Sequence, residues 1–109
     1  MAKVRQNERL QSGNKKTLTF TITGEDITGS TPVWKLYPFK SDVAVLSKSL
    51  GSGLTITNAA SGVLQITLDA ADTTNLGGHY RHELQITDAS SNVNTVSTGL
   101  LYIYDSLIA

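Results

Sequence analysis

The sequence predicts an all-β chain folded as an antiparallel β-sandwich of about seven or eight short strands. Three observations lead to this prediction. Apolar and polar residues alternate with a period of two in several short runs, and no run has a helical period. Turn-forming Gly, Asn, Asp and Ser separate these runs roughly every ten residues. The chain has no cysteine, so no disulfide forms and packing must hold the two sheets together.

Length and charge restrict the class of protein. A chain of 109 residues makes one domain, which can bury a core without a metal ion or a disulfide. A net charge of zero argues against a dedicated nucleic-acid binder. The charge is uneven, because residues 1–16 hold five Lys or Arg against one Glu, or +4, and residues 17–109 therefore carry −4. We divide the chain into a basic N-terminal arm or first strand (1–16), a sandwich (17–105) and a C-terminal tail (106–109).

Neither a membrane span nor a secretory signal is expected. No apolar run approaches the roughly 20 residues that a membrane helix needs. Residues 1–5, Met-Ala-Lys-Val-Arg, contain no apolar stretch of the kind that signal peptides carry.

The first two segments differ in how strongly their sequence patterns predict a strand. Residues 3–10 are a polar strand or arm, whose pairing the sequence leaves open. Residues 17–23 alternate without error, with Leu18, Phe20 and Ile22 on one face and threonines on the other. Such a run predicts a strand with one buried and one solvated face.

The next two elements are a strong strand and a weak one. Residues 33–39 place Trp34 and Leu36 on one face, and Pro38 puts the end of this strand at an edge or a bend. Residues 43–50 form a weaker strand because their alternation is incomplete.

The second half of the chain holds four further strands. They are expected at residues 54–57, 63–68, 80–87 and 93–104. A glycine inside the last one, Gly99, predicts a β-bulge at which the buried face switches. The expected core is Leu18, Phe20, Ile22, Trp34, Leu36, Leu64, Ile66, Leu68, Tyr80, Leu84 and Ile86.

A corner between two of these strands specifies the kind of sandwich. Asp69 is placed to cap a single turn that contains Asp72, and Gly78 allows backbone angles that other residues avoid. Tyr80 then opens a strand, as the tyrosine corner of immunoglobulin-like sandwiches does. Its hydroxyl is expected to donate to a backbone carbonyl between residues 69 and 76. Trp34 matches the buried strand-C tryptophan of that fold.

Four motifs in order resemble a known family. They read Asp26-Ile-Thr-Gly29, Gly62-Val-Leu-Gln-Ile-Thr-Leu68, Gly78-His-Tyr80 and Gly99-Leu-Leu-Tyr-Ile103. This order is similar to small immunoglobulin-like structural proteins of tailed phages, including the N-terminal domain of baseplate upper proteins. Two features depart from that pattern: the polar arm has no counterpart, and the long helical or stem region of baseplate upper proteins does not follow.

The resemblance implies a function without catalysis. It implies a virion structural protein in a head decoration, neck, tail or baseplate, assembled in the host cytoplasm. Its partners would be copies of itself and neighbouring virion proteins, without a membrane, nucleic acid or cofactor. No catalytic residue is carried over, because the family is structural.

The residues themselves point to no reaction and no metal. His79 and His82 lie three apart, so a strand sends them to opposite faces and they cannot easily share a metal ion. Asp69, Asp72 and Asp88 suit caps and turns better than acid–base or calcium chemistry. No phosphate-binding loop or catalytic triad order is present, and we expect neither an enzyme nor a cofactor.

Two surfaces are candidates for assembly. The last strand is apolar on both faces, which predicts a covered edge or a contact in a homo-oligomer. The arm carries basic residues that suit contact with an acidic neighbour or with the acidic body of another copy; the alternatives are an arm that lines a DNA-filled interior and a plain solvated first strand. The candidate contacts are Leu100, Tyr102, Tyr104, Lys3, Arg5 and Arg9.

An alternative function is carbohydrate binding by an adhesin-like module. An exposed aromatic surface for sugar would draw on Tyr37, Phe39, Tyr102 and Tyr104. Packing at a strand edge is the simpler interpretation of the same residues, since strands favour aromatic side chains.

Overall fold

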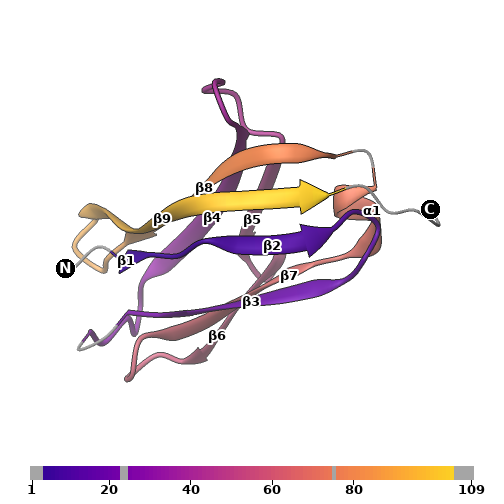
Figure 1. Cartoon of the computed structure of the whole chain (residues 1–109). Coiled ribbons are helices and arrows are strands. Elements are labelled where there is room, and N and C mark those ends of the chain that lie inside the picture. The colour runs from indigo at the N-terminus through magenta and orange to yellow at the C-terminus, as the bar shows by residue number, and fades with distance from the viewer. Residues whose placement is uncertain (1–3, 23–24, 75, 105–109) are drawn as a thin grey trace.

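The computed structural model describes residues 4–22, 25–74 and 76–104, and these form nine strands and one short helix (Figure 1). Lys3 and the expected tail at 106–109 lie outside the described residues. The elements are β1 (Val4–Arg5), β2 (Glu8–Gln11), β3 (Lys16–Thr21), β4 (Thr31–Pro38), β5 (Leu46–Leu50), β6 (Gly53–Asn58), β7 (Val63–Leu68), α1 (Ala70–Thr73), β8 (Gly78–Thr87) and β9 (Val93–Tyr104).

The strands form two packed layers, which confirms the predicted sandwich. One layer has the order β2–β9–β8–β4–β5, with β1 beside β9, and the other has the order β6–β7–β3. A short parallel pairing of β5 with β6 joins the two layers on one side. On the other side, β2 and β3 are edge strands within the described part of the chain.

The core lies between the layers and follows from the alternation in the sequence. All eleven residues expected there are buried. Six further apolar side chains complete it. They come from β2, from the loop between β3 and β4, from β6 and from β9, and they are Leu10, Ile27, Leu54, Val96, Leu101 and Ile103. The N-terminal segment therefore contributes to the core through Leu10.

The pairing of the N-terminal segment, which the sequence leaves open, is parallel. β1 and β2 both run along β9, with Arg5 opposite Thr98 and Leu10 opposite Ile103. Between the two strands, the Gln6 N–H donates to the Thr98 carbonyl at 2.8 Å, so that the ladder continues through the gap. Residues 4–11 are thus a first strand of the sandwich, interrupted once.

Two expectations about strands need correction. The strand expected over residues 43–50 begins only at Leu46, because Val43 belongs to a turn in which its N–H donates to Ser41 Oγ at 3.1 Å. Val43 is accordingly 74% exposed. The bulge expected at Gly99 is at Val96 instead, where the register between β8 and β9 shifts. Val96 and Ser97 are consequently buried in succession.

Candidate assembly surface

A buried histidine connects the core to the N-terminal segment. His82 on β8 is 1% exposed, and its ring lies 5.9 Å, centroid to centroid and edge-on, from Phe20. The indole N–H of Trp34 donates to His82 Nδ1 at 3.3 Å. An indole nitrogen can only donate, so Nδ1 is the acceptor and the ring proton lies on Nε2. Nε2 therefore donates to the Gln6 carbonyl at 2.6 Å.

The environment of His82 favours its neutral form. Burial lowers the pKa of His82 below its usual value, against smaller raising effects of the Gln6 carbonyl and of the Glu8 charge. The neutral ring suits the site, because a protonated Nδ1 would face the Trp34 N–H, donor against donor. His79, three residues earlier, lies exposed on the other face of β8, as the spacing predicts.

Gly99 on β9 lies beside the hydrogen bond between His82 Nε2 and the Gln6 carbonyl. A Cβ at this position would lie 1.7 Å from the Gln6 carbonyl oxygen and 2.8 Å from His82 Nε2. No other residue fits there, so the close approach of two backbones explains this glycine, and a bulge does not. The Leu100 N–H then donates to Asn7 Oδ1 at 3.0 Å, which fixes the same segment from the next residue.

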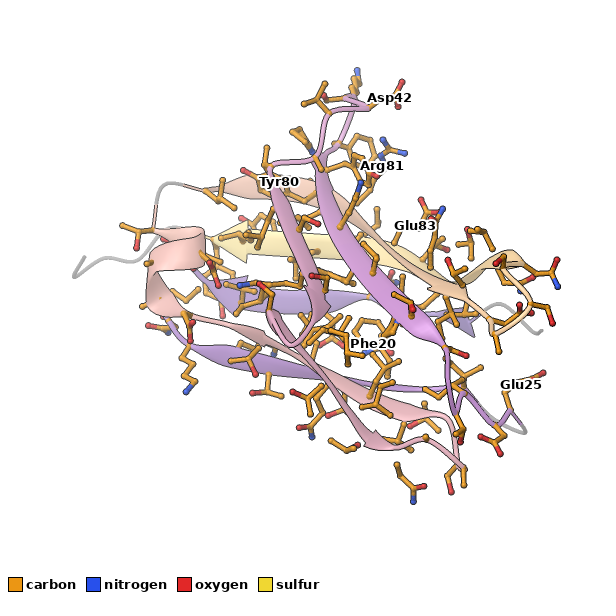
Figure 2. All side chains as sticks on the ribbon, turned by 180° about the vertical axis from the view of Figure 1, so that it is seen from behind. Phe20, Glu25, Asp42, Tyr80, Arg81 and Glu83 are labelled. Carbon is orange, nitrogen blue, oxygen red and sulfur yellow. The ribbon has the colours of Figure 1, made fainter. Side chains whose placement is uncertain are left out.

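The corner at the start of β8 forms as expected, apart from its acceptor. Tyr80 lies on β8 (Figure 2). Its hydroxyl pairs with both the N–H and the carbonyl of Gly77 at 3.2 Å, one residue beyond the predicted range. Asp69 occupies the N-cap position of α1, and its N–H donates to the Asp72 carboxylate at 2.8 Å. Gly78 has φ of 104°, as its predicted role requires.

The same Asp72 carboxylate ties the corner to β5. Lys48 Nζ lies 2.8 Å from it, and both side chains are largely buried. A Cβ at Gly53 would lie 2.5 Å from Lys48 Cδ, so this glycine leaves room for the lysine stem. The corner residues are therefore structural.

The outer face of β9, β8 and β4 carries most of the exposed aromatic rings. His79 stacks on Tyr102 with 4.7 Å between ring centroids, and Tyr102 lies 5.7 Å from Tyr104. The Arg9 guanidinium lies 5.6 Å from the Tyr104 ring centroid. We call this surface the aromatic face. Its residues, each with part of its surface in solvent, are Tyr37, Phe39, His79, Leu100, Tyr102 and Tyr104.

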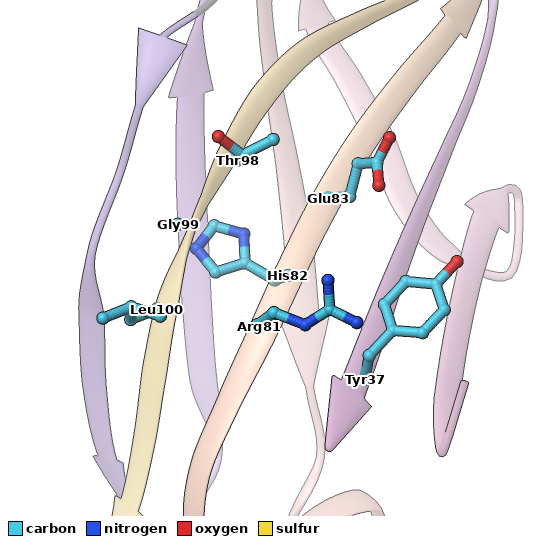
Figure 3. A pocket seen from close by; sticks show the side chains of 7 residues that line it. All are labelled: Tyr37, Arg81, His82, Glu83, Thr98, Gly99 and Leu100. Atoms are coloured by element: carbon cyan, nitrogen blue, oxygen red, sulfur yellow. The ribbon is translucent and has the colours of Figure 1, made fainter. Parts of the chain in front are cut away.

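A shallow hollow of about 200 Å³ lies in the aromatic face (Figure 3). Its polar groups are engaged with neighbours. Arg81 donates to the Ser41 carbonyl at 2.7 Å, and Glu83 accepts from the Thr95 hydroxyl at 2.8 Å. The lining residues are Tyr37, Arg81, His82, Glu83, Thr98, Gly99 and Leu100. A second, more open hollow is lined by Phe39, His79 and Leu100.

The structure brings together only part of the predicted contact set. Leu100, Tyr102 and Tyr104 share the outer face of β9, and Arg9 on β2 joins them. Arg5 is placed in β1 by its backbone pairing. The sequence interpretation missed the contributions of His79 and Arg81, although the period of two on β8 places both outward. What the sequence could not supply was the register that sets His79 opposite Tyr102.

Two further features of the described residues bear on other functions. No three or more His, Asp or Glu side chains there gather closely enough to hold a metal ion. In the same ranges, no helix has the length and apolar character to cross a membrane.

Comparison with known proteins identifies a fold. No family model and no curated protein matches the sequence. Among solved structures, one of VGSC beta subunits, from a photo-crosslinking study of their multimeric cell-adhesive interactions, superposes with a TM-score of 0.52. The two are 11% identical, over 94% of this chain and 93% of the other. An identity this low carries architecture and no activity. The chain has an immunoglobulin-like β-sandwich fold.

Proposed function

We propose that this chain is a non-enzymatic structural protein of a phage particle, which acts by protein–protein assembly through its aromatic face. The observation that carries the proposal is the row of partly or fully exposed rings beside Arg9, in which His79 stacks on Tyr102 and Tyr104 lies next to Tyr102. Aromatic and arginine side chains are the ones that supply most of the binding energy at protein interfaces. The phage setting rests on the order of the four motifs in the sequence.

The geometry of the face suits binding to a folded partner. His79, Tyr102 and Tyr104 stand on the paired strands β8 and β9 and contact one another, so their rotamers are already restricted before binding. Less side-chain entropy is then lost when a partner covers them. The face is bordered by charges of both signs, Lys35, Arg81, Glu83 and Asp42, which can set the orientation of a partner. Figure 2 shows Arg81 and Asp42 at the same end of the molecule.

The size of the exposed apolar side chains also supports an interface. Phe39 is 49% exposed and Tyr104 is 36% exposed, and both lie on the same layer. Contiguous apolar patches on a protein surface are commonly interaction sites.

The test is incorporation of tagged chains into particles of the phage whose genome encodes the protein. Phe39→Asp and Tyr102→Asp place a charge on the aromatic face, whereas Thr55→Asp places one on the exposed face of β6 as a matched control. Interface hot spots contribute about 2 kcal/mol or more, so each face variant should incorporate at least about tenfold less well than the control. Circular dichroism checks that all three variants fold. Equal incorporation of the three, or absence of the wild-type chain from particles, would contradict the proposal.

Carbohydrate binding is the second candidate, and the hollow in the aromatic face favours it. Tyr37 offers the ring face that the Arg81 guanidinium, 5.6 Å from its centroid, does not cover. Arg81 and Glu83 offer beside it the hydrogen-bonding positions that their bonds to Ser41 and Thr95 leave over. Sugar sites combine such rings with a few polar groups. A glycan array is the direct test: saturable binding that Tyr37→Ala removes and Thr55→Ala leaves intact would support this function, and no binding to any glycan would reject it.

A further inference from the structure

We infer that residues 4–11 form an exchangeable strand, which fills the groove along β9 in a second copy of this chain as it fills its own. The inference deepens the proposed assembly function by naming the partner of one edge, and it rests on that function for the setting in which copies meet. Arg9 of this strand borders the aromatic face, but the exchange is tested at Arg5, Thr98 and Gly99, which are not among the residues of that face, so the two can be tested apart.

The groove is built to receive one particular strand. Gly99 leaves the space through which the Gln6 carbonyl reaches His82 Nε2 at 2.6 Å. Four positions later, Leu10 is 4% exposed and lies opposite Ile103 in the core. The ladder and the His82 contact that receive the strand belong to β8 and β9, and two side-chain contacts come from β3. All these elements follow the strand in the chain, so the same contacts form whether the strand belongs to the same chain or to another.

The strand is attached along one edge only. It pairs with β9 in parallel, and parallel pairing is slightly weaker per residue than antiparallel pairing. Two polar side-chain contacts reach from it to β3: Gln6 Nε2 donates to the Thr19 carbonyl at 3.0 Å, and Glu8 lies 4.0 Å from Lys16. Residues 4–11 can therefore leave and return as one unit.

A short turn connects this unit to the rest of the chain. Residues 12–15 lead from β2 in one layer to β3 in the other, with Gly13 at a φ of 81°. The turn is held by the Asn14 N–H on the Gln11 carbonyl at 3.2 Å and by the Gly13 N–H on Thr73 Oγ at 3.0 Å. Opening it loses these bonds, whereas exchange recovers every contact of the groove. Exchange of an identical element is a low-cost route to a dimer for this reason.

Concentration and charge decide between the closed and the exchanged form. A short linker holds the strand at an effective concentration of about millimolar at its own groove. Exchange therefore becomes competitive only where copies are packed at comparable concentration, as in an assembled array. Residues 1–11 carry three basic residues against Glu8, a net charge of +2, and residues 12–109 carry −2 by difference. This complementarity favours the approach of the strand to a second copy.

The experiment uses introduced cysteines, since the chain has none of its own. Arg5 and Thr98 are register partners, so cysteines at the two positions lie on adjacent strands about 4.8 Å apart, within reach of a disulfide. An Arg5→Cys chain and a Thr98→Cys chain are unfolded together, refolded as a mixture at about millimolar concentration, and oxidised. Only a strand of one chain in the groove of the other brings the two cysteines together.

The expected result is a disulfide-linked heterodimer, formed several-fold more than in a mixture of Arg5→Cys with Thr57→Cys. Thr57 is more exposed than Thr98 and lies on β6 in the other layer, so that pair measures random cross-linking. Adding Gly99→Ala to the Thr98→Cys chain should remove the excess, because the added Cβ occupies the path of the Gln6 carbonyl. A single chain with both Arg5→Cys and Thr98→Cys should close an internal disulfide at high dilution.

Two results would overturn the inference. One is a heterodimer yield no higher with Thr98→Cys than with Thr57→Cys, which would mean that the strand stays in its own chain. The other is failure of the double-cysteine chain to close, which would mean that the groove does not hold this register. Thr98 borders the hollow of the aromatic face, but neither Arg5 nor Thr98 is among the residues that define that face. These failures therefore leave the proposed interface standing, and a chain absent from particles would leave the exchange standing.

Discussion

The Gln6 carbonyl oxygen lies 2.6 Å from His82 Nε2, although 76 residues separate the two in the chain. Through its other ring nitrogen the same histidine accepts the Trp34 indole N–H. One buried ring thus joins β8, β4 and the N-terminal segment. In antibody domains this position, two residues after the corner tyrosine, holds a disulfide cysteine. Here the packing of the His82 ring against Phe20 on β3 connects the two layers instead, and the two hydrogen bonds of His82 hold it within its own layer.

Replacing His82 with leucine should destabilise the fold by about 2–4 kcal/mol, because two buried hydrogen-bonding groups, the Trp34 N–H and the Gln6 carbonyl, lose their partner. The measurement is the urea midpoint. His79→Leu is the matched control, since His79 is exposed and surface changes usually stay within about 0.5 kcal/mol. Equal midpoints for the two variants would show that His82 contributes nothing beyond volume.

The stability of the wild-type protein should fall as the pH falls below about 6.5, the value of a free histidine. Burial lowers the pKa of folded His82, so the unfolded chain binds its proton first. Stability is therefore complete above about 6.5 and is lost between that pH and the lower pKa of the folded state, with a slope of at most about 1.4 kcal/mol per pH unit. Urea midpoints measured against pH should show this slope in the wild type and lose it in His82→Leu. An unchanged slope in that variant would assign the effect to other groups.

Gly99→Ala should displace the N-terminal segment from β9. The new Cβ would lie 1.7 Å from the Gln6 carbonyl oxygen, and backbone cannot move aside as a flexible side chain would. Hydrogen exchange should show loss of protection at the Leu100 N–H, which Asn7 caps. Overpacking costs about 1–3 kcal/mol, and removal of residues 1–7 should make the substitution nearly neutral. Retained protection at Leu100 in the full chain would contradict this account of the glycine.

Tyr80→Phe should cost about 0.5–1.5 kcal/mol with the fold retained, the usual net contribution of one hydrogen bond. The hydroxyl that it removes pairs with the backbone of Gly77. Tyr37→Phe serves as the control, because that ring lies half-buried on the outer face. A denaturation midpoint for Tyr80→Phe equal to that of Tyr37→Phe would argue against a stabilising corner.

The sequence was informative wherever a period of two meets a buried face. It placed the core residues of β3, β4, β7 and β8, and it located the corner at Tyr80, because alternation and turn residues are local signals. It also placed a strand over residues 93–104, the bounds that β9 has.

The features that the sequence could not predict depend on contacts between strands that are distant in the chain. A polar segment with Val4 and Leu10 as its only apolar residues gives no indication of which strand it joins, or in which direction. The hydrogen-bond acceptor for His82 is a backbone carbonyl. Every residue has one, so the sequence does not indicate which residue provides it. The sequence marks Gly99 as a residue with a structural role, but it does not distinguish a bulge from a close backbone approach, because both call for glycine.

The central claim, that the aromatic face is an assembly surface, is tested most directly by an electron cryo-microscopy reconstruction of the phage particle that carries this chain. The account predicts density for the sandwich with the outer face of β9, β8 and β4 against a neighbouring subunit, and with His79, Tyr102 and Tyr104 covered. A reconstruction in which the chain is present and these three side chains face solvent would contradict it.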